Sequence, residues 1–278
     1  MRDPAVWRVA TFNLWNRQGP WDQRRPLIEA GLAALDADVI GVQEALALGD
    51  APGQAHALAA ALGYHVYYAP AWAIGGGLTF GNAILSPHPI TDGACVPLPT
   101  PAGLDTRSIA FARVAAPHGP IPVFVTHLTV QPELCHVRRA QVVALADEVA
   151  ARAPVDGPPP VILGDFNAAP DADEIRFLRG RTSLDGRSVY FADAWAVAAE
   201  GPGHTYDRRN PYARRSREPS ARLDYVFVRG PDARLRGEPI AARLALDAPT
   251  AGVWPSDHYA VVADIYAAPR ALTDVADD

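Results

Sequence analysis

An acid and a histidine stand side by side near the C-terminal end of the chain, at Asp257 and His258. They follow the turn-forming pair Pro255-Ser256 and precede an apolar run that begins at Ala260. A histidine can give or take a proton near neutral pH, and a carboxylate can hold a divalent metal ion. Because successive side chains of a strand point to opposite sides, the two neighbours are expected to perform different tasks.

Polar residues follow four other apolar segments, and a fifth segment carries an acid within it. The four segments are residues 7–12, 38–42, 121–125 and 160–163. The polar residues that follow them are Asn13, Gln43 with Glu44, His127, and Asp165 with Asn167. The fifth segment, 222–228, contains Asp224. A buried strand tolerates a carboxylate poorly unless it is paired or bound to a metal. The repeated pattern therefore predicts that these residues converge on one pocket.

The elements that must position these residues are both strands and helices. The spacing of apolar residues predicts helices at Arg24–Leu35, Gln54–Leu62, Glu133–Arg152 and Asp173–Leu178. Short apolar runs separated by turn residues between positions 64 and 125 predict strands with antiparallel neighbours. Many strands with few helices favour two packed sheets with helices outside them.

The length of 278 residues suits one large domain or two small ones. The candidate residues run from Asn13 to His258, so a division anywhere would split the pocket. We therefore predict a single domain over residues 1–266, followed by a short frayed tail at 267–278. Two cysteines, Cys95 and Cys135, are too few for a disulfide framework, and we expect no disulfide.

The chain contains no lysine and carries a formal net charge of -6 at pH 7. This charge gives no general attraction to nucleic acid, although a local basic surface would suffice for a nuclease. No apolar run reaches the ~20 residues that cross a membrane. The sequence Met1-Arg2-Asp3-Pro4 does not begin a signal peptide, so a cytoplasmic location is expected.

The motifs resemble those of the endonuclease/exonuclease/phosphatase superfamily, which includes deoxyribonuclease I, abasic-site endonucleases, neutral sphingomyelinases, inositol polyphosphate phosphatases and poly(A) deadenylases. The resemblance runs from Val6 to Ile265, and its most specific motifs are residues 164–167 and 256–258. Residues 81–86 are similar to a further family strand. The resemblance implies an α/β (α+β) fold, a four-layer α/β/β/α sandwich with two packed mixed sheets flanked by helices. It also implies a Mg²⁺- or Mn²⁺-dependent hydrolase of phosphate esters.

A Mg²⁺ ion prefers hard oxygen ligands and keeps several waters, so one or two carboxylates are enough to hold it. Glu44 is the first candidate ligand, with Asn13 and Asp257 completing or supporting the shell. Two structural alternatives stay open at this stage. In the first, Glu44 pairs with an arginine and holds no metal. In the second, Asn13 caps the turn that follows it.

The predicted catalytic residues are His127, Asp165, Asn167, Asp224 and His258. The resemblance implies that Asp224 orients His258 and favours its protonated form. His127 would donate to a phosphate oxygen, and Asn167 would fix the attacking water or a phosphoryl oxygen. Whether Asp165 or His258 takes the proton of the water stays open. A buried core histidine is the structural alternative for His127.

Substrate contacts are less well defined by the sequence. The loop between Tyr206 and Asp224 holds six arginines, of which Arg208, Arg214 and Arg215 are the candidates for gripping phosphates. The alternative is a solvated loop in a protein that lacks lysine. Asn82 either organises the site or satisfies strand ends. Four tryptophans would either stack on a substrate or pack in the core, namely Trp15, Trp21, Trp72 and Trp254.

The predicted activity is hydrolysis of a phosphodiester in a nucleic acid, a nucleotide or a phospholipid head group. The segment at 204–211 has a weak similarity to bacterial sphingomyelinase-like members. Ala169 stands where inositol 5-phosphatases carry an arginine, which argues against an inositol polyphosphate. One alternative is a phosphomonoesterase acting on a soluble metabolite. A catalytically silent phosphate-binding scaffold is disfavoured because Glu44, Asp165 and His258 are all present.

Overall fold

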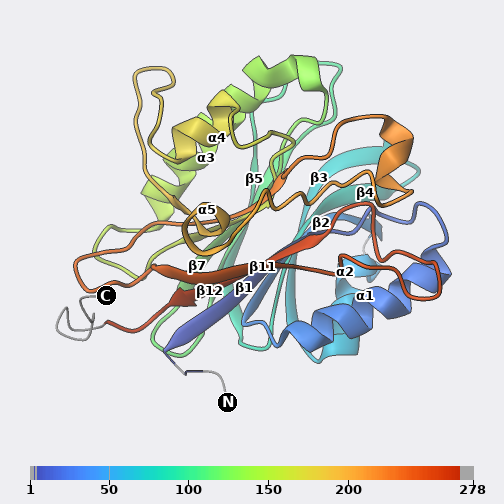
Figure 1. The fold of residues 1–278 in the computed structure, drawn as a ribbon, viewed down its shortest axis with the longest axis horizontal. Coiled ribbons are helices and arrows are strands. Elements are labelled where there is room, and N and C mark those ends of the chain that lie inside the picture. The colour runs from blue at the N-terminus through green and yellow to red at the C-terminus, as the bar shows by residue number, and fades with distance from the viewer. Residues whose placement is uncertain (1–2, 4, 50, 270–278) are drawn as a thin grey trace.

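The computed structural model describes residues 3, 5–49 and 51–269. In this part of the chain, two six-stranded sheets pack face to face between two layers of helices (Figure 1). The first sheet has the order β11-β12-β1-β2-β4-β3. Its strands are β1 Val6–Asn13, β2 Val39–Leu48, β3 His65–Gly75, β4 Leu78–Ser86, β11 Pro239–Ala245 and β12 Ala260–Tyr266.

The second sheet has the order β5-β6-β7-β8-β10-β9. Its strands are β5 Ile90–Pro97, β6 Ser108–Val114, β7 Ile121–His127, β8 Val161–Asp165, β9 Ala192–Asp193 and β10 Asp224–Val228. Both sheets are mixed, because β1 pairs with β2 and β7 pairs with β8 in parallel, while the other pairings are antiparallel.

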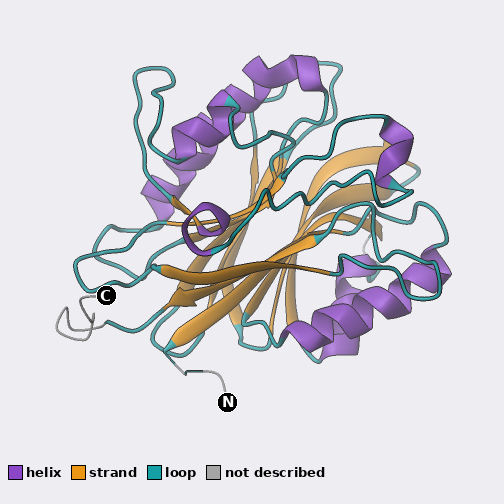
Figure 2. Cartoon of the chain, in the orientation of Figure 1, coloured by secondary structure: helices purple, strands orange, loops and turns teal. Residues whose placement is uncertain are grey.

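Helices cover the outer face of each sheet (Figure 2). On the first sheet lie α1 Trp21–Leu35 and α2 Gln54–Leu62, and on the second lie α3 Cys135–Arg152 and α4 Asp173–Leu178. In α3 the buried residues Val142, Leu145 and Val149 recur at helical spacing and pack on the second sheet. The predicted four-layer α/β/β/α sandwich is confirmed.

The core between the sheets consists of small and branched apolar side chains. Val9, Val125 and Leu163 are fully buried there, and burying each such side chain stabilises the fold by about 1.5–3 kcal/mol. Gly41 in β2 lets the sheets approach closely. A Cβ atom at this position would lie 2.9 Å from Leu163 Cβ and 3.0 Å from Val125 Cγ2. The absence of a side chain at Gly41 therefore sets the separation of the sheets at this point.

The predicted helices at 54–62 and 173–178 have the bounds found in the structure, and α1 begins three residues before its predicted start. The predicted helix at 133–152 begins within the 3-10 helix η1 Pro132–Leu134 and continues as α3. Four elements escaped prediction: the helix α5 Ala194–Ala198, the 3-10 helix η2 Ala213–Ser216, and the strands β9 and β11. The prediction that the second strand ends at Val42 is wrong, since β2 continues to Leu48.

The ends of the predicted domain differ slightly from the structure. Ala267 is buried, and its N–H donates to the carbonyl of Ala5 at 2.8 Å, so the packed fold extends past residue 266. The remainder of the predicted tail, residues 270–278, lies outside the described residues. Cys95 and Cys135 are both free and exposed. No helix in the described ranges has both the length and the apolar character that a membrane span requires.

Candidate active site

Strand pairing brings three predicted residues together at one end of the second sheet. His127 is the last residue of β7 and is the register partner of Asp165, the last residue of β8. Asp165 is in turn the partner of Asp224, the first residue of β10. The first sheet contributes Asn13 at the end of β1 and His258 just before β12. A pocket of about 390 Å³ opens over this end of the sandwich.

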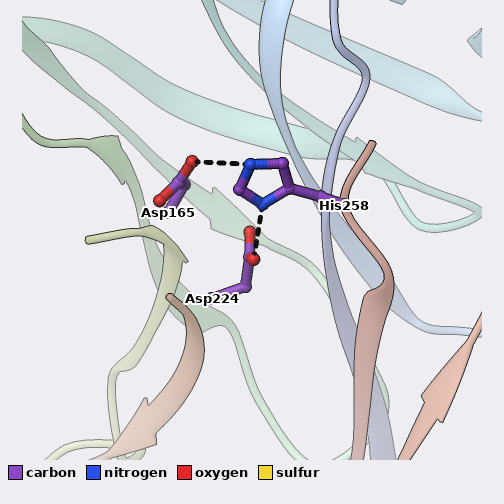
Figure 3. A group of neighbouring side chains, drawn as sticks. All are labelled: Asp165, Asp224 and His258. Carbon is purple, nitrogen blue, oxygen red and sulfur yellow. Dashed lines mark hydrogen bonds and ion pairs between the residues drawn. The ribbon is translucent and has the colours of Figure 1, made fainter. Parts of the chain in front are cut away.

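His258 lies between two carboxylates (Figure 3). Its Nδ1 is 2.8 Å from Asp224 Oδ2, and its Nε2 is 3.7 Å from Asp165 Oδ2. All three side chains are buried. Because Nδ1 donates to Asp224, the ring presents its other nitrogen to Asp165 and to the pocket.

Asp165 is the centre of the polar contacts that link the two sheets. Its Oδ2 accepts from Asn13 Nδ2 at 2.9 Å and lies 3.5 Å from His127 Nε2. Its Oδ1 accepts from the backbone N–H of Asn167 at 2.9 Å. The side chain of Asn167 donates to the carbonyl of Leu128, which ties the loops after β7 and β8 together. These contacts fix the orientation of the carboxylate.

Glu44 sits in a β-bulge, where the pairing of β2 with β4 shifts register between Val42 and Ala45. Its φ of 60° lies in the left-handed region, which costs a non-glycine residue about 1–3 kcal/mol. Glu44 is partly buried and lines the pocket. Its carboxylate accepts from Asn13 Nδ2 at 3.2 Å and from Asn16 Nδ2 at 3.0 Å. The bulge therefore directs into the pocket a side chain that regular pairing would direct elsewhere.

Asn13 connects the carboxylates of Glu44 and Asp165 through its amide nitrogen. Its Oδ1 accepts from the backbone N–H of Trp15 at 2.9 Å, which is the turn-capping contact considered as the alternative to metal binding. Ser256 Oγ donates to the carbonyl of Asn13 at 2.8 Å and contacts Asp257 Oδ1 at 3.2 Å. Asn13 is thus primarily a bridge between acidic groups.

The electrostatics of the pocket follow from burial and from these contacts. Burial lowers the pKa of His258, but Asp224 and Asp165 outweigh this effect and raise it well above 6.5. Burial raises the pKa of Asp165 and of Asp257 to about 6 each, against the lowering effect of His258. Burial also raises the pKa of Glu44. A cation bound nearby would stabilise the ionised form of each of these carboxyl groups and lower its pKa.

Comparison with known proteins agrees with this geometry. The model of the Endonuclease/Exonuclease/phosphatase family matches residues 10–258, which is most of the chain. The chain belongs to the endonuclease/exonuclease/phosphatase family. Members of this family generally hydrolyse phosphate esters, and they typically depend on a divalent metal. No curated protein sequence matches the chain significantly.

Solved structures of other family members have the same fold. An endonuclease/exonuclease/phosphatase from Beutenbergia cavernae is 26% identical with a TM-score of 0.72, over 94% of this chain and 72% of that one. The human Nocturnin catalytic domain with bound sulfate is 21% identical with a TM-score of 0.70, over 95% and 94%. Truncated TDP2 from Caenorhabditis elegans is 19% identical with a TM-score of 0.70, over 94% and 98%.

The donor set fits the divalent metal that the family implies. Glu44 and Asp257 are oxygen donors that line the same pocket, and the charge of Glu44 helps to raise the pKa of Asp257. Ligand-type atoms of Asp165, Asp224 and His258 also lie within 4.8 Å of one another. However, both ring nitrogens of His258 already face carboxylates, and Mg²⁺ prefers oxygen ligands. The carboxylates of Glu44 and Asp257 are therefore the better candidates.

Arg107 is a pocket residue that the sequence did not reveal. It is buried just before β6 and lines the pocket, and its guanidinium lies 6.0 Å from the ring centroid of Phe80. Its Nε and Nη1 have no hydrogen-bond partner among the described residues. Burial lowers the pKa of Arg107, whereas Glu44, Asp105 and Asp165 raise it, and the group remains a cation. A fixed positive charge with free donors suits an anion such as a phosphate.

The segment 205–210 contacts Asp224, His258 and the turn before His258. Thr205 Oγ1 accepts from the backbone N–H of Asp224 at 3.1 Å. The ring of Tyr206 packs on His258 with a centroid distance of 5.0 Å. Asn210 Nδ2 donates to the carbonyl of Ser256 at 2.7 Å. The segment that resembles a family motif thus holds Asp224 and His258 in place through these contacts.

Arg24 of α1 holds two pocket loops together. Its buried guanidinium donates to the carbonyls of Leu14, Asn16, Gln18 and Pro255. It also lies 4.9 Å from the ring centroid of Trp15. Burial lowers the pKa of Arg24 to about 10, so the group stays charged at neutral pH. A single helical arginine gave no sequence signal because its partners are backbone carbonyls.

The predicted substrate contacts lie mostly outside the pocket. Arg208, Arg214 and Arg215 are exposed, and none of them lines it. Asn82 is buried between the sheets, where its Nδ2 donates to the carbonyl of Ser108 at 2.9 Å. Arg222 forms a buried ion pair with Asp193. Among the four tryptophans, the two that line the pocket are Trp15 and Trp72.

Proposed function

We propose that this chain is a divalent-metal-dependent phosphodiesterase. The observation that carries the proposal is the position of His258, which lies between Asp224 and Asp165 and faces the same pocket as Arg107 and His127. This arrangement offers fixed donors for a phosphoryl group beside carboxylates that can hold a metal and accept a proton.

In the proposed reaction, Asp165 takes the proton of the attacking water as the water oxygen bonds to phosphorus. The phosphorus–oxygen bond to one ester group breaks, and the released oxygen takes up a proton from solvent. Asn13 and the backbone N–H of Asn167 hold the Asp165 carboxylate in place. His258, flanked by two carboxylates, carries a positive charge and donates to a phosphoryl oxygen through Nε2. Asp224 keeps the ring oriented for this contact.

Arg107 and His127 would bind the other phosphoryl oxygens. His127 lies beside Asp165 at the end of the parallel strand pair, so its Nε2 faces the same space. Glu44 and Asp257 would hold Mg²⁺, because carboxylate oxygens bind this hard cation better than they bind softer metals. When bound, the metal supplies positive charge next to a phosphoryl oxygen and so favours attack at phosphorus.

A diester is favoured over a monoester by the charges of the pocket. A monoester carries up to two negative charges on its phosphate near neutral pH, whereas a diester carries one. Of the described residues that line the pocket, Arg107 is the single arginine, and several carboxylates share the space with it. The apolar surfaces of Trp15 and Trp72 offer room for ester groups on a less charged phosphate.

The test is Mg²⁺-dependent hydrolysis of bis-p-nitrophenyl phosphate compared with p-nitrophenyl phosphate. The expected result is faster turnover of the diester, which is lost on chelation and in Glu44→Ala. Glu133→Ala, which replaces an exposed acid outside the pocket lining, is the matched control and should behave like wild type. Preference for the monoester would replace the proposal with a phosphomonoesterase, and equal activity in Glu44→Ala would remove Glu44 from the metal site.

A further inference from the structure

The pocket is lined by charged groups that differ in how far they are buried. Its buried positive or protonatable groups are Arg107, His127 and His258, which lie at the end of the sandwich where the sheets meet. Asp105 and Glu218 also line the pocket, but Asp105 is only partly buried and Glu218 is exposed. Arg107 and His258 can bind an anion in the buried part, where the carboxylates of Glu44, Asp165 and Asp257 also lie, and Asp105 and Glu218 add two further carboxylates nearer the surface.

These two further carboxylates come from separate loops. Asp105 lies in the connection between β5 and β6, close enough to Arg107 to raise its pKa. Glu218 lies in the connection between η2 and β10, close enough to Tyr206 to raise the pKa of the phenol. A second phosphate attached to one bound at Arg107 and His258 would bring further negative charge into a pocket that these two carboxylates line, and they would repel it.

The arginines of the loop between Tyr206 and Asp224 do not line the pocket. Ser216 and Glu218 line the pocket, whereas Arg217 between them does not. The guanidinium of Arg215 lies 5.7 Å from the ring centroid of Tyr212, which stacks on Trp15. The arginine-rich loop thus contributes an acid to the pocket and keeps its bases outside the lining.

The remaining walls are apolar and aromatic. Trp72 and Phe80 meet at nearly right angles, with an interplanar angle of 77° and centroids 6.4 Å apart. Trp15 and the partly exposed Val130 also line the pocket. Such walls suit a planar or apolar group rather than a charged one.

We infer that the substrate is a small phosphodiester with a single phosphate and at least one planar or apolar ester group, and that Asp105 and Glu218 exclude polyanions. This inference rests on the proposed phosphodiesterase activity. It assigns the two carboxylates as specificity determinants against nucleic acid chains, which carry one phosphate for every nucleotide. Neither residue is required for the chemical step.

The experiment follows hydrolysis of bis-p-nitrophenyl phosphate while a short oligothymidylate, which carries several adjacent phosphates, is added as a competitor. The variant is Asp105→Asn combined with Glu218→Gln, and Glu218→Gln alone serves if the double variant folds poorly. The control is Asp156→Asn combined with Glu133→Gln, which removes the same number of charges from exposed sites outside the lining. Each inhibition constant is measured at low and high NaCl.

The expected result is weak inhibition of the wild type that becomes stronger as salt rises, because salt screens the repulsion. A protein that grips a nucleic acid backbone shows the opposite salt dependence. The double variant should bind the competitor about tenfold more tightly at low salt, with kcat/KM for the one-phosphate probe within about twofold of wild type. The control should keep the weak inhibition.

Tight inhibition of the wild type that weakens with salt would overturn the inference, and so would equal inhibition of the double variant and the wild type. Either result leaves the proposed activity intact, because the probe is still hydrolysed. Absence of Mg²⁺-dependent hydrolysis of the probe would instead overturn the phosphodiesterase proposal, and the inference that rests on it would fall with it.

Discussion

Asp224 Oδ2 lies 2.8 Å from His258 Nδ1, and this contact crosses from one sheet of the sandwich to the other. Asp224 begins β10 in the second sheet, and His258 precedes β12 in the first. The hydrogen bond between Asn13 and Asp165 also joins the two sheets. Because the polar groups of the site span both sheets, the site forms only when the sheets have docked.

Replacing Asp224 with Asn should lower the pKa of His258. Burial alone lowers it, and the carboxylates hold it above 6.5, so removing one carboxylate moves it down. The charge on His258 contributes stability below its unfolded-state pKa of ~6.5, and this contribution is lost as pH rises through the folded value. NMR titration of the imidazole in the metal-free protein measures the shift, and kcat should fall by about 10²-fold. An unchanged imidazole titration would contradict the assigned pairing.

Replacing Asp257 with Asn should stabilise the metal-free protein at pH 8. Burial raises the pKa of Asp257 to about 6, so its ionised form destabilises the fold. This penalty is absent below the unfolded pKa of ~3.9, grows as pH rises through the folded value and is complete above it. Urea unfolding in the presence of a chelator should show a gain of about 1–3 kcal/mol at pH 8 and none near pH 4. The same difference in unfolding free energy between variant and wild type at both pH values would show that burial does not destabilise ionised Asp257.

Adding Mg²⁺ should raise the thermal midpoint of the wild type, since a ligand of the folded state stabilises it by mass action. Glu44→Ala should lose most of this response, whereas Glu133→Ala should keep it. The comparison needs no substrate and therefore tests the metal site separately from the reaction. A full response in Glu44→Ala would move the ligand set to other carboxylates.

Replacing Arg107 with Ala should lower kcat/KM for a phosphodiester by about 10²-fold, because a buried cationic donor to the phosphate is lost. The joint replacement of Arg214, Arg215 and Arg217 with Ala should leave KM for the same substrate within about twofold, since none of the three lines the pocket. A large rise in KM for the loop variant would restore the arginine loop as a substrate contact.

Replacing Arg24 with Lys should lower the free energy of unfolding by about 2–4 kcal/mol. A lysine has one ammonium group and cannot satisfy the four backbone carbonyls that the guanidinium reaches. Arg25→Lys is the matched control, because Arg25 is the exposed neighbour on the same helix and should change stability by less than about 0.5 kcal/mol. Similar losses in the two variants would show that the loop contacts of Arg24 matter little.

Residues at regular strand ends could be predicted from the sequence. His127 and Asp165 follow apolar runs and Asp224 interrupts one, and strand pairing places the three side by side. The resemblance to the family added the layer order of the fold, which local patterns could not supply. These predictions depend on repeated, local signals that burial makes visible in the sequence.

Other features depend on tertiary contacts and left no such signal. The sequence predicts that the second strand ends before Glu44, whereas β2 continues through a bulge at Glu44. This bulge is defined by the pairing of β2 with β4 and leaves no local signal in the sequence. Arg107 follows a loop rather than an apolar run, and Arg24 has backbone partners, so neither belongs to a motif. The arginines of the loop at 206–224 were conspicuous by composition, although their side chains do not line the pocket.

Gly41 has a consequence for reactivity as well as for packing. The groups proposed to hold the metal lie on one sheet, whereas the group proposed to accept the proton lies on the other, and Gly41 sets the gap beneath them. A methyl group at residue 41 would push the two sheets apart in the core and so move one half of the reaction centre away from the other. Packing in the apolar core thus controls the distance between the proton acceptor, Asp165, and the phosphorus atom that the metal would activate.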